Sequence, residues 1–223
     1  MAPTHGGPVT LSAALSLRCL SARKVSDIVR GNKLTKDELR KQFCVLRRDQ
    51  VRALPDSMRG LVFHRPPAPL LELIPDDAVI GLYRAGPFEA PAASYATFFA
   101  EREHQLTLPR FATRTAPMEF ARFTDPYDES DLEIGPFGML QPLADAPVDD
   151  PDVLIVPLVG FTAKGERLGQ GGGHYDRWLA TRPNVRTVGL GWDCQLTETL
   201  PTEPHDQRLD AVVTPTRMYG PFE

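Results

Sequence analysis

The sequence has few cysteines, and none of them has a spacing that would give it a structural role. Its three cysteines, Cys19, Cys44 and Cys194, are far apart, and no CxxC pair is present. A disulfide framework or a zinc knuckle is built from such pairs, so we expect neither. Isolated cysteines are typical of proteins in a reducing compartment, and we therefore expect a cytoplasmic protein.

Long hydrophobic runs and an excess of basic charge are also missing. No stretch approaches the ~20 apolar residues that cross a bilayer, so we expect no contact with a membrane. The formal net charge is −4, and the basic residues concentrate near the start: residues 34–223 hold 20 basic and 28 acidic residues, a net charge of −8. Nucleic-acid binding needs a basic surface and is not expected. A local basic pocket can still hold an anion such as ATP.

The motifs of covalent catalysis and of common nucleotide sites are absent as well. No GxSxG elbow and no Cys/His arrangement is present, so no catalytic nucleophile is assigned. Residues 160–165 carry the glycine spacing of a P-loop, but Glu166 and Arg167 follow where Lys and Ser or Thr are needed. The dinucleotide fingerprint GxGxxG has His174 in place of its last glycine.

Proline, in contrast, is abundant, with 22 residues in a chain of 223. This is about twice the usual ~5 %. It predicts short elements joined by rigid turns and excludes a long helical bundle.

The length suits one large domain with an appendage. We expect a domain over residues 34–223 and a basic, serine-rich leader over 1–33. The leader is either a mitochondrial-type transit peptide or a disordered extension without a targeting role.

Hydrophobic periodicity predicts alternating strands and helices. Thr35 and Glu38 have the spacing of a capping box, which would begin an amphipathic helix of about four turns that ends before Pro55. Its basic residues, Arg47 among them, are expected to be mainly solvated. Further helices are predicted over 94–105 and 175–181, a long loop over 125–152, and strands over 77–83, 106–111, 118–123, 152–158, 186–191 and 211–214. The alternation predicts a layered α/β fold.

Glycines gather in residues 164–177, KGERLGQGGGHYDR. Glycines let the backbone adopt positive φ and bring several N–H groups close to a ligand. Because this loop precedes a predicted helix and is flanked by Arg167 and Arg177, a phosphate group fits there. The carboxylate of Asp176 beside a phosphate site is a natural Mg²⁺ ligand. A flexible turn without a ligand is the plain alternative.

The stretch RLGQGGGHYDRWL closely resembles the signature of the 5-formyltetrahydrofolate cyclo-ligase family. Weaker similarities follow the same order over about residues 35–216, in the segments KDELRKQFCVLRR, IGLYRAGPFE, PRF, MEF, DVLIVPLVGF and QLTETLPTEPHDQRLDAVVTP. The resemblance implies a three-layer α/β/α, Rossmann-like fold with a central, mostly parallel sheet. It also implies a monomeric ligase that uses Mg²⁺ and ATP to convert 5-formyltetrahydrofolate to 5,10-methenyltetrahydrofolate, with release of ADP and phosphate.

The resemblance also implies roles for single residues. ATP would be bound by Lys36, Arg40, Arg167, Gly169, Gln170, Gly171, Gly172, Gly173 and Tyr175. The reduced folate would be contacted by Arg84, Glu89, Gln170 and His174, and Mg²⁺ would be held by Asp176 and Asp206. Gln195 is also expected to touch the site.

Two positions depart from the family pattern. His174 stands where many members have Tyr, and Gln141 stands where many have Glu in a GxxEP segment. Both departures leave the predicted phosphate and metal groups unchanged. They motivate an alternative function, a non-catalytic module that binds folate or nucleotide. A third hypothesis, a sugar-phosphate isomerase on a related α/β fold, rests on fold analogy alone.

Overall fold

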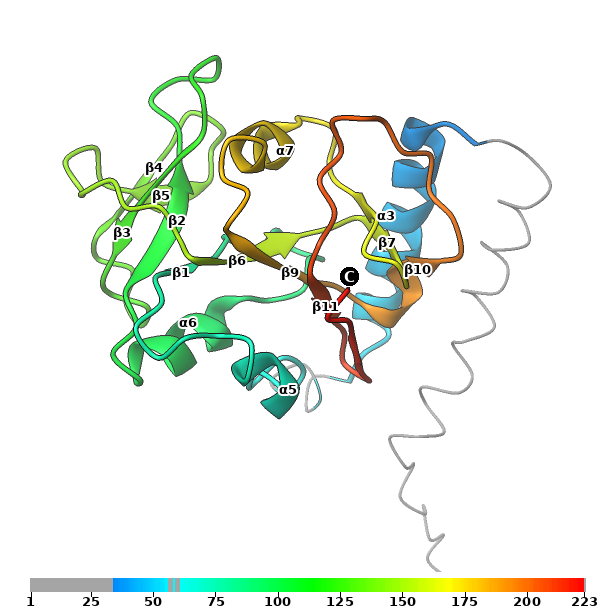
Figure 1. Cartoon of the computed structure of the whole chain (residues 1–223), viewed down its shortest axis with the longest axis horizontal. Coiled ribbons are helices and arrows are strands. Elements are labelled where there is room, and N and C mark those ends of the chain that lie inside the picture. Colours follow the sequence, from blue (N-terminus) through cyan, green and yellow to red (C-terminus); the bar gives the residue numbers. More distant parts are fainter. Residues whose placement is uncertain (1–33, 56–57, 59–60, 223) are drawn as a thin grey trace, which may run out of the picture.

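A seven-stranded sheet runs through the middle of the protein (Figure 1), which is described here by a computed structural model covering residues 34–55, 58 and 61–222. The strand order is β12-β11-β9-β6-β1-β2-β3. The inner strands are parallel, and the two edge strands, β12 and β3, are antiparallel to their neighbours. The strands are β1 (Ile80–Gly81), β2 (Leu106–Arg110), β3 (Glu119–Phe123), β6 (Val153–Pro157), β9 (Arg186–Leu190), β11 (Ala211–Val213) and β12 (Met218–Tyr219).

Helices lie on both sides of this sheet. In Figure 1, α5 (Ala68–Leu71) and α6 (Ala93–Ala100) lie below the sheet, and α7 (His174–Leu179) lies above it. The long helix α3 (Lys36–Arg52) stands beside one end of the sheet, where it packs next to the 3-10 turn η1 (Asp193–Gln195). The predicted α/β/α layering with a mostly parallel sheet is confirmed.

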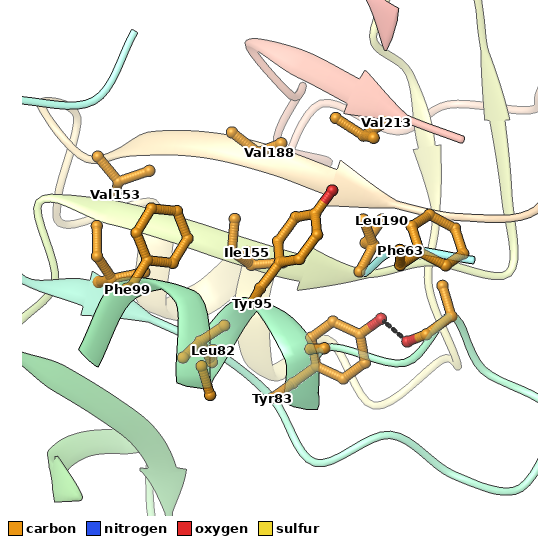
Figure 2. Close-up of a cluster of buried hydrophobic side chains, with 14 of the residues drawn as sticks. Phe63, Leu82, Tyr83, Tyr95, Phe99, Val153, Ile155, Val188, Leu190 and Val213 are labelled. Carbon is orange, nitrogen blue, oxygen red and sulfur yellow. Dashed lines mark hydrogen bonds between the residues drawn. The ribbon is translucent and has the colours of Figure 1, made fainter. Parts of the chain in front are cut away.

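Strand β6 is buried on both faces, as its continuous apolar run predicts. Val153 and Ile155 belong to the cluster between the sheet and α6, whereas Leu154 and Val156 belong to the cluster between the sheet and α7. Figure 2 shows the first cluster, in which Tyr95 and Phe99 of α6 lie over strands β6 and β9. The two clusters fix the sheet between its helices, so the strand ends have defined positions.

Helix α3 begins as its sequence predicts. Thr35 and Glu38 form the capping box: the Glu38 carboxylate accepts a hydrogen bond from the Thr35 N–H at 2.8 Å, and the Thr35 hydroxyl accepts one from the Glu38 N–H. Leu39 and Phe43 are fully buried in a third cluster with Val159 and Leu168. This packing fixes α3 against the segment that leads into the glycine loop.

The predicted loop over 125–152 is wrong in its middle. Residues there form an antiparallel hairpin of β4 (Leu132–Ile134) and β5 (Leu140–Pro142). The strands are only three residues long, and the strongly apolar Ile134 is 78 % exposed, so neither length nor burial pattern marks them in the sequence. A second small sheet, β10-β7-β8, was also not predicted; its strands are β7 (Gly160–Thr162), β8 (Arg167–Leu168) and β10 (Leu196–Thr197).

Helix α6 ends at Ala100, five residues before its predicted end at Gln105. Glu103 adopts a left-handed conformation with φ of 65°. The His104 N–H then bonds to the Phe99 carbonyl and the Glu103 N–H to the Ala100 carbonyl, which is a Schellman termination.

Within the described residues, no helix has both the length and the apolar character needed to span a membrane. The predicted leader lies outside the described residues.

Candidate active site

A cavity of about 490 Å³ opens between helix α3, the glycine loop and the β4–β5 hairpin. Tyr83, Pro109 and Pro157 line it and stand at or just beyond the carboxyl ends of β1, β2 and β6. Open parallel sheets bind their ligands at this end of the strands, because loops from several strands converge there. The cavity therefore lies where the fold itself favours a ligand.

The glycine loop forms one wall of this cavity. It joins β8 to α7, and its last residue, Gly173, caps α7 in a left-handed conformation with φ of 63°. Gly171 also has positive φ, and a Cβ there would lie 3.2 Å from the guanidinium carbon of Arg40. Arg40 in turn donates from Nε to the Gly169 carbonyl at 2.9 Å. The loop therefore uses glycine both for its backbone conformation and to allow α3 to approach.

Lys36 enters the cavity from the first turn of α3. Its ammonium bonds to both Asp206 oxygens, at 2.9 and 2.7 Å, and to Glu203 at 2.6 Å. Burial opposes the charge on Lys36, but these hydrogen bonds outweigh it and raise the pKa of the ammonium. Burial likewise works to raise the pKa of Asp206, and the hydrogen bond from Lys36 more than compensates, so the pKa of Asp206 is lowered.

Arg167 and Asp176 form a second ion pair beside the loop. Arg167 Nη2 lies 2.6 Å from Asp176 Oδ1, and the Arg167 side chain is only 3 % exposed. The same carboxylate oxygen accepts the Gln207 N–H at 3.2 Å, which ties α7 to the turn that carries Asp206. In both ion pairs, a residue predicted to bind phosphate is paired with a carboxylate predicted to bind the metal.

The far end of the cavity is aromatic. Phe111, Phe137 and His174 meet edge to face, with ring centroids 4.9 to 5.7 Å apart. Desolvation, together with the nearby charge of Arg177, lowers the pKa of His174 from its ordinary value. The imidazole is therefore mainly neutral near pH 7 and offers an apolar ring face to this end.

Glu89 lies between the two ends. Its Oε1 accepts a hydrogen bond from the Gln170 amide at 2.6 Å, and its Oε2 accepts the Gly86 N–H at 2.8 Å. Arg84 forms an ion pair with Glu129 at the rim. Because Gln170 belongs to the glycine loop, the contact links the loop to the segment after β1.

The residues predicted to bind ATP, folate or Mg²⁺ all line this one cavity: Lys36, Arg40, Arg84, Glu89, Arg167, Gly169, Gln170, Gly171, Gly172, Gly173, His174, Tyr175, Asp176 and Asp206. The structure thus brings together side chains from α3, the β1 loop, the glycine loop, α7 and the 203–207 turn. The ligand that each contacts stays a prediction.

The profile of the 5-formyltetrahydrofolate cyclo-ligase family matches residues 32–215 of the sequence. The chain belongs to this family. The Escherichia coli K12 5-formyltetrahydrofolate cyclo-ligase is 42 % identical over 103 residues, which are 44 % of this chain and 57 % of that enzyme. The Haemophilus influenzae enzyme is 44 % identical over 79 residues, 33 % of this chain and 42 % of that one. The chain thus aligns with about half the length of these curated relatives.

Solved structures of methenyltetrahydrofolate synthetases share the fold. The Aquifex aeolicus 5,10-methenyltetrahydrofolate synthetase superimposes with a TM-score of 0.67 at 25 % identity, over 85 % of this chain and 94 % of that chain. The Mycoplasma pneumoniae enzyme gives a TM-score of 0.59 at 20 % identity, over 80 % and 98 % of the two chains. The second match carries information about the fold alone.

Gln141, a departure from the family pattern, has a clear structural role in this cyclo-ligase family member. It is buried; its Oε1 accepts the Phe111 N–H at 3.0 Å, and its Nε2 donates to the Phe111 carbonyl at 3.2 Å. An amide can make both bonds because it carries a donor and an acceptor, whereas a carboxylate only accepts. Gln141 thus clamps the β4–β5 hairpin to the residue that follows β2.

Two expectations about neighbouring residues were wrong. Gln195 does not line the cavity; it is buried and donates to the carbonyls of Leu158 and Val159. Arg47, expected among the solvated basic residues of α3, is only 8 % exposed. Arg47 continues the buried stripe of Leu39 and Phe43 at intervals of four residues, a signal that its charge outweighed in the prediction. The burial of Gln195 depends on Leu158 and Val159, which are distant along the chain.

Proposed function

We propose that the protein converts 5-formyltetrahydrofolate to 5,10-methenyltetrahydrofolate, using ATP and Mg²⁺ and releasing ADP and phosphate. The observation that carries this proposal is the meeting of the residues predicted to bind ATP, folate and Mg²⁺ in one cavity with two chemically different ends. The end with Lys36, Arg40, Arg167 and the glycine loop suits a triphosphate. The end with Phe111, Phe137 and His174 suits a flat, partly apolar ring system.

The metal-binding residues also fit Mg²⁺. Asp176 and Asp206 supply carboxylate oxygens, the ligands that this ion prefers alongside phosphate oxygens. Glu203 and His205 lie close by, and ligand atoms of these two residues and of Asp206 all fall within 4.8 Å of one another. When bound, the metal would neutralise charge on the phosphate oxygens. We propose Asp176 and Asp206 as its protein ligands.

The reaction proceeds in two steps. The formyl oxygen on N5 attacks the γ-phosphorus, the bond to the ADP oxygen breaks, and an imidoyl phosphate forms. N10 then attacks the formyl carbon and loses its proton, and phosphate departs with the former formyl oxygen to leave the methenyl bridge. Such steps need positioning and charge stabilisation more than a nucleophilic side chain. Lys36, Arg40, Arg167 and the loop N–H groups supply these, and Glu89 orients the folate.

One assay tests the proposal directly. The purified full chain is mixed with 5-formyltetrahydrofolate and Mg·ATP, and the absorbance of methenyltetrahydrofolate is followed together with ADP release. We expect both products in equal amounts, and neither without ATP or in excess EDTA. Folate binding without product would favour the non-catalytic binding module instead.

The proposal also covers the cellular setting. The isolated cysteines favour a reducing compartment, and in the structure Cys44 and Cys194 are free thiols. We therefore propose a cytoplasmic protein, and the family resemblance leads us to propose a monomer. A mitochondrial location is the alternative if residues 1–33 act as a transit peptide, and the Arabidopsis thaliana relative is itself described as mitochondrial.

A further inference from the structure

Arg47 is a buried cation just behind the wall of the cavity. It lies on α3, eleven residues after Lys36 and seven after Arg40, so the three residues share one face of the helix. Unlike the other two, Arg47 does not line the cavity. Its Nη1 lies 3.6 Å from Oε1 of Glu89, whose side chain is 9 % exposed. A buried guanidinium therefore faces the carboxylate that is proposed to contact the folate.

The guanidinium of Arg47 is poorly satisfied where it lies. Its Nε and Nη1 are buried, and neither has a hydrogen-bond partner among the residues that the structure describes. A buried donor without a partner costs about 1–3 kcal/mol, and more when the group is charged. The attraction of Glu89 is the compensation that the structure provides. A side chain with only a packing role would not need a buried charge with this energetic cost.

Stability alone does not explain such a pair. Replacing a buried ion pair by apolar side chains of similar volume is often neutral or stabilising. The α3 interface already has well-packed apolar residues, Leu39 and Phe43, that hold the helix in place. A charged residue at position 47 therefore points to a role at the cavity, through its contact with Glu89.

The contacts of Glu89 indicate that role. The Gly86 N–H and the Gln170 amide each donate to one carboxylate oxygen, and Arg47 approaches from the side of α3. A carboxylate has about four lone-pair sites, so Glu89, which lines the cavity, keeps capacity to accept a hydrogen bond from a ligand there. A cap of three neighbours around one carboxylate restricts its rotation and fixes where those remaining sites point.

We propose that Arg47 is a positioning residue: it holds the Glu89 carboxylate in the orientation that accepts N–H donors of the reduced folate. This inference rests on the proposed function, because it assigns folate as the ligand of Glu89. Arg47 itself touches no substrate. It acts through Glu89, and its effect falls on folate binding and not on the nucleotide.

A double-mutant cycle tests this coupling. The affinity for 5-formyltetrahydrofolate is measured by calorimetry, without nucleotide, for the unmodified chain, Arg47→Met, Glu89→Gln and the double variant. The affinity for Mg·ADP and the thermal midpoint are measured in parallel. Arg48→Met is the matched control, since Arg48 lies on the same helix, is 43 % exposed and forms an ion pair with the adjacent, exposed Asp49. A second cycle uses Arg47→Lys, which keeps the charge, so the test does not depend on the folding of Arg47→Met.

We expect Arg47→Met to weaken folate binding about tenfold or more in the unmodified background, and by less than about twofold once Glu89 is Gln. Arg47→Lys should recover part of the loss, and Mg·ADP affinity should not change. Equal losses in both backgrounds, or an equal loss of Mg·ADP affinity, would overturn the role of Arg47 and leave the proposed function standing. If the unmodified chain binds Mg·ADP but no reduced folate, the proposed function fails, and the role of Arg47 fails with it.

Discussion

The two ends of the cavity are prepared for their ligands in different ways. At the charged end, Lys36 is bound to Asp206 and Glu203, and Arg167 is bound to Asp176, so cations and carboxylates neutralise one another. At the aromatic end, ring contacts and the Gln141 clamp on Phe111 hold the wall in place without ion pairs of this kind.

This difference has a consequence for binding. At the charged end, the existing ion pairs must break before the cations can face phosphate and the carboxylates can face a metal. If ATP and Mg²⁺ bind as proposed, the free energy of those pairs opposes either ligand alone and is recovered when both are bound, so nucleotide and metal binding would favour one another. The aromatic end needs no such exchange, because its groups are already oriented. Substitutions at the charged end should therefore alter the coupling between nucleotide and metal binding. Substitutions at the aromatic end should alter how well the folate fits.

The largest effect is expected from Asp176→Asn. The amide oxygen still accepts the hydrogen bonds from Arg167 and the Gln207 N–H, so the fold is kept, but the negative charge for the metal is lost. We expect kcat to fall by at least about a hundredfold, since metal stabilisation of phosphoryl transfer is worth several kcal/mol. Steady-state kinetics with the thermal midpoint measures this. Asp145→Asn, on an exposed loop, is the control, and an unchanged rate would refute the metal assignment of Asp176.

Asp206→Asn tests the exchange of partners at the charged end. Lys36 loses a carboxylate partner, so we expect ADP in excess EDTA to bind more tightly than to the unmodified chain. Mg·ADP should bind more weakly, and each change should be on the order of tenfold. Titration calorimetry measures both. Asp49→Asn removes the same charge from an exposed site and should change neither. Weaker binding of ADP under both conditions would contradict the exchange.

Gln141→Glu, which introduces the residue that many family members have, tests the aromatic end. The Phe111 carbonyl loses its donor and faces a carboxylate, so we expect a loss of about 1–3 kcal/mol in the free energy of unfolding. The KM for folate should rise severalfold, while the KM for Mg·ATP stays the same. Urea unfolding and kinetics check the two parts. Gln105→Glu, at an exposed position, controls for the added charge. Equal increases in both KM values would show that the two ends are not independent.

The smallest effect concerns the pH dependence of His174. Its pKa is lowered in the fold by desolvation and by Arg177, while the facing rings of Phe111 and Phe137 carry no charge. The unfolded chain then binds a proton more readily than the folded one. The stabilisation is present above the ordinary histidine pKa of about 6.5 and is lost as pH falls below it. The thermal midpoint of the unmodified chain should therefore fall slightly more between pH 7 and pH 5 than that of His174→Phe. Parallel curves for the two proteins would refute this.

The sequence was most informative where local patterns carry the structure. The capping residues of α3, the two-sided burial of β6 and the glycine loop all depend on neighbours along the chain, and all three were predictable. The β4–β5 hairpin was not, because its strands are only three residues long and lie in a segment rich in Pro, Asp and Gly. Contacts at and behind the cavity wall were also missed: nothing in the sequence near Gln141 indicates its bonds to Phe111, and nothing near Arg47 indicates that it faces Glu89. Side-chain partners across the fold are set by packing, which a single sequence does not reveal.

The clamp made by Gln141 also makes the β4–β5 hairpin an exchangeable part. The hairpin pairs only with itself as a sheet within the described residues, and its outer residues Ile134 and Phe137 face solvent at least in part. Its tip can therefore change in length and composition without disturbing the seven-stranded sheet, provided that the bonds to Phe111 are kept. Because Phe137, Met139 and Leu140 also line the cavity, grafting residues 132–142 between relatives while keeping Gln141 is a modular way to reshape the aromatic end.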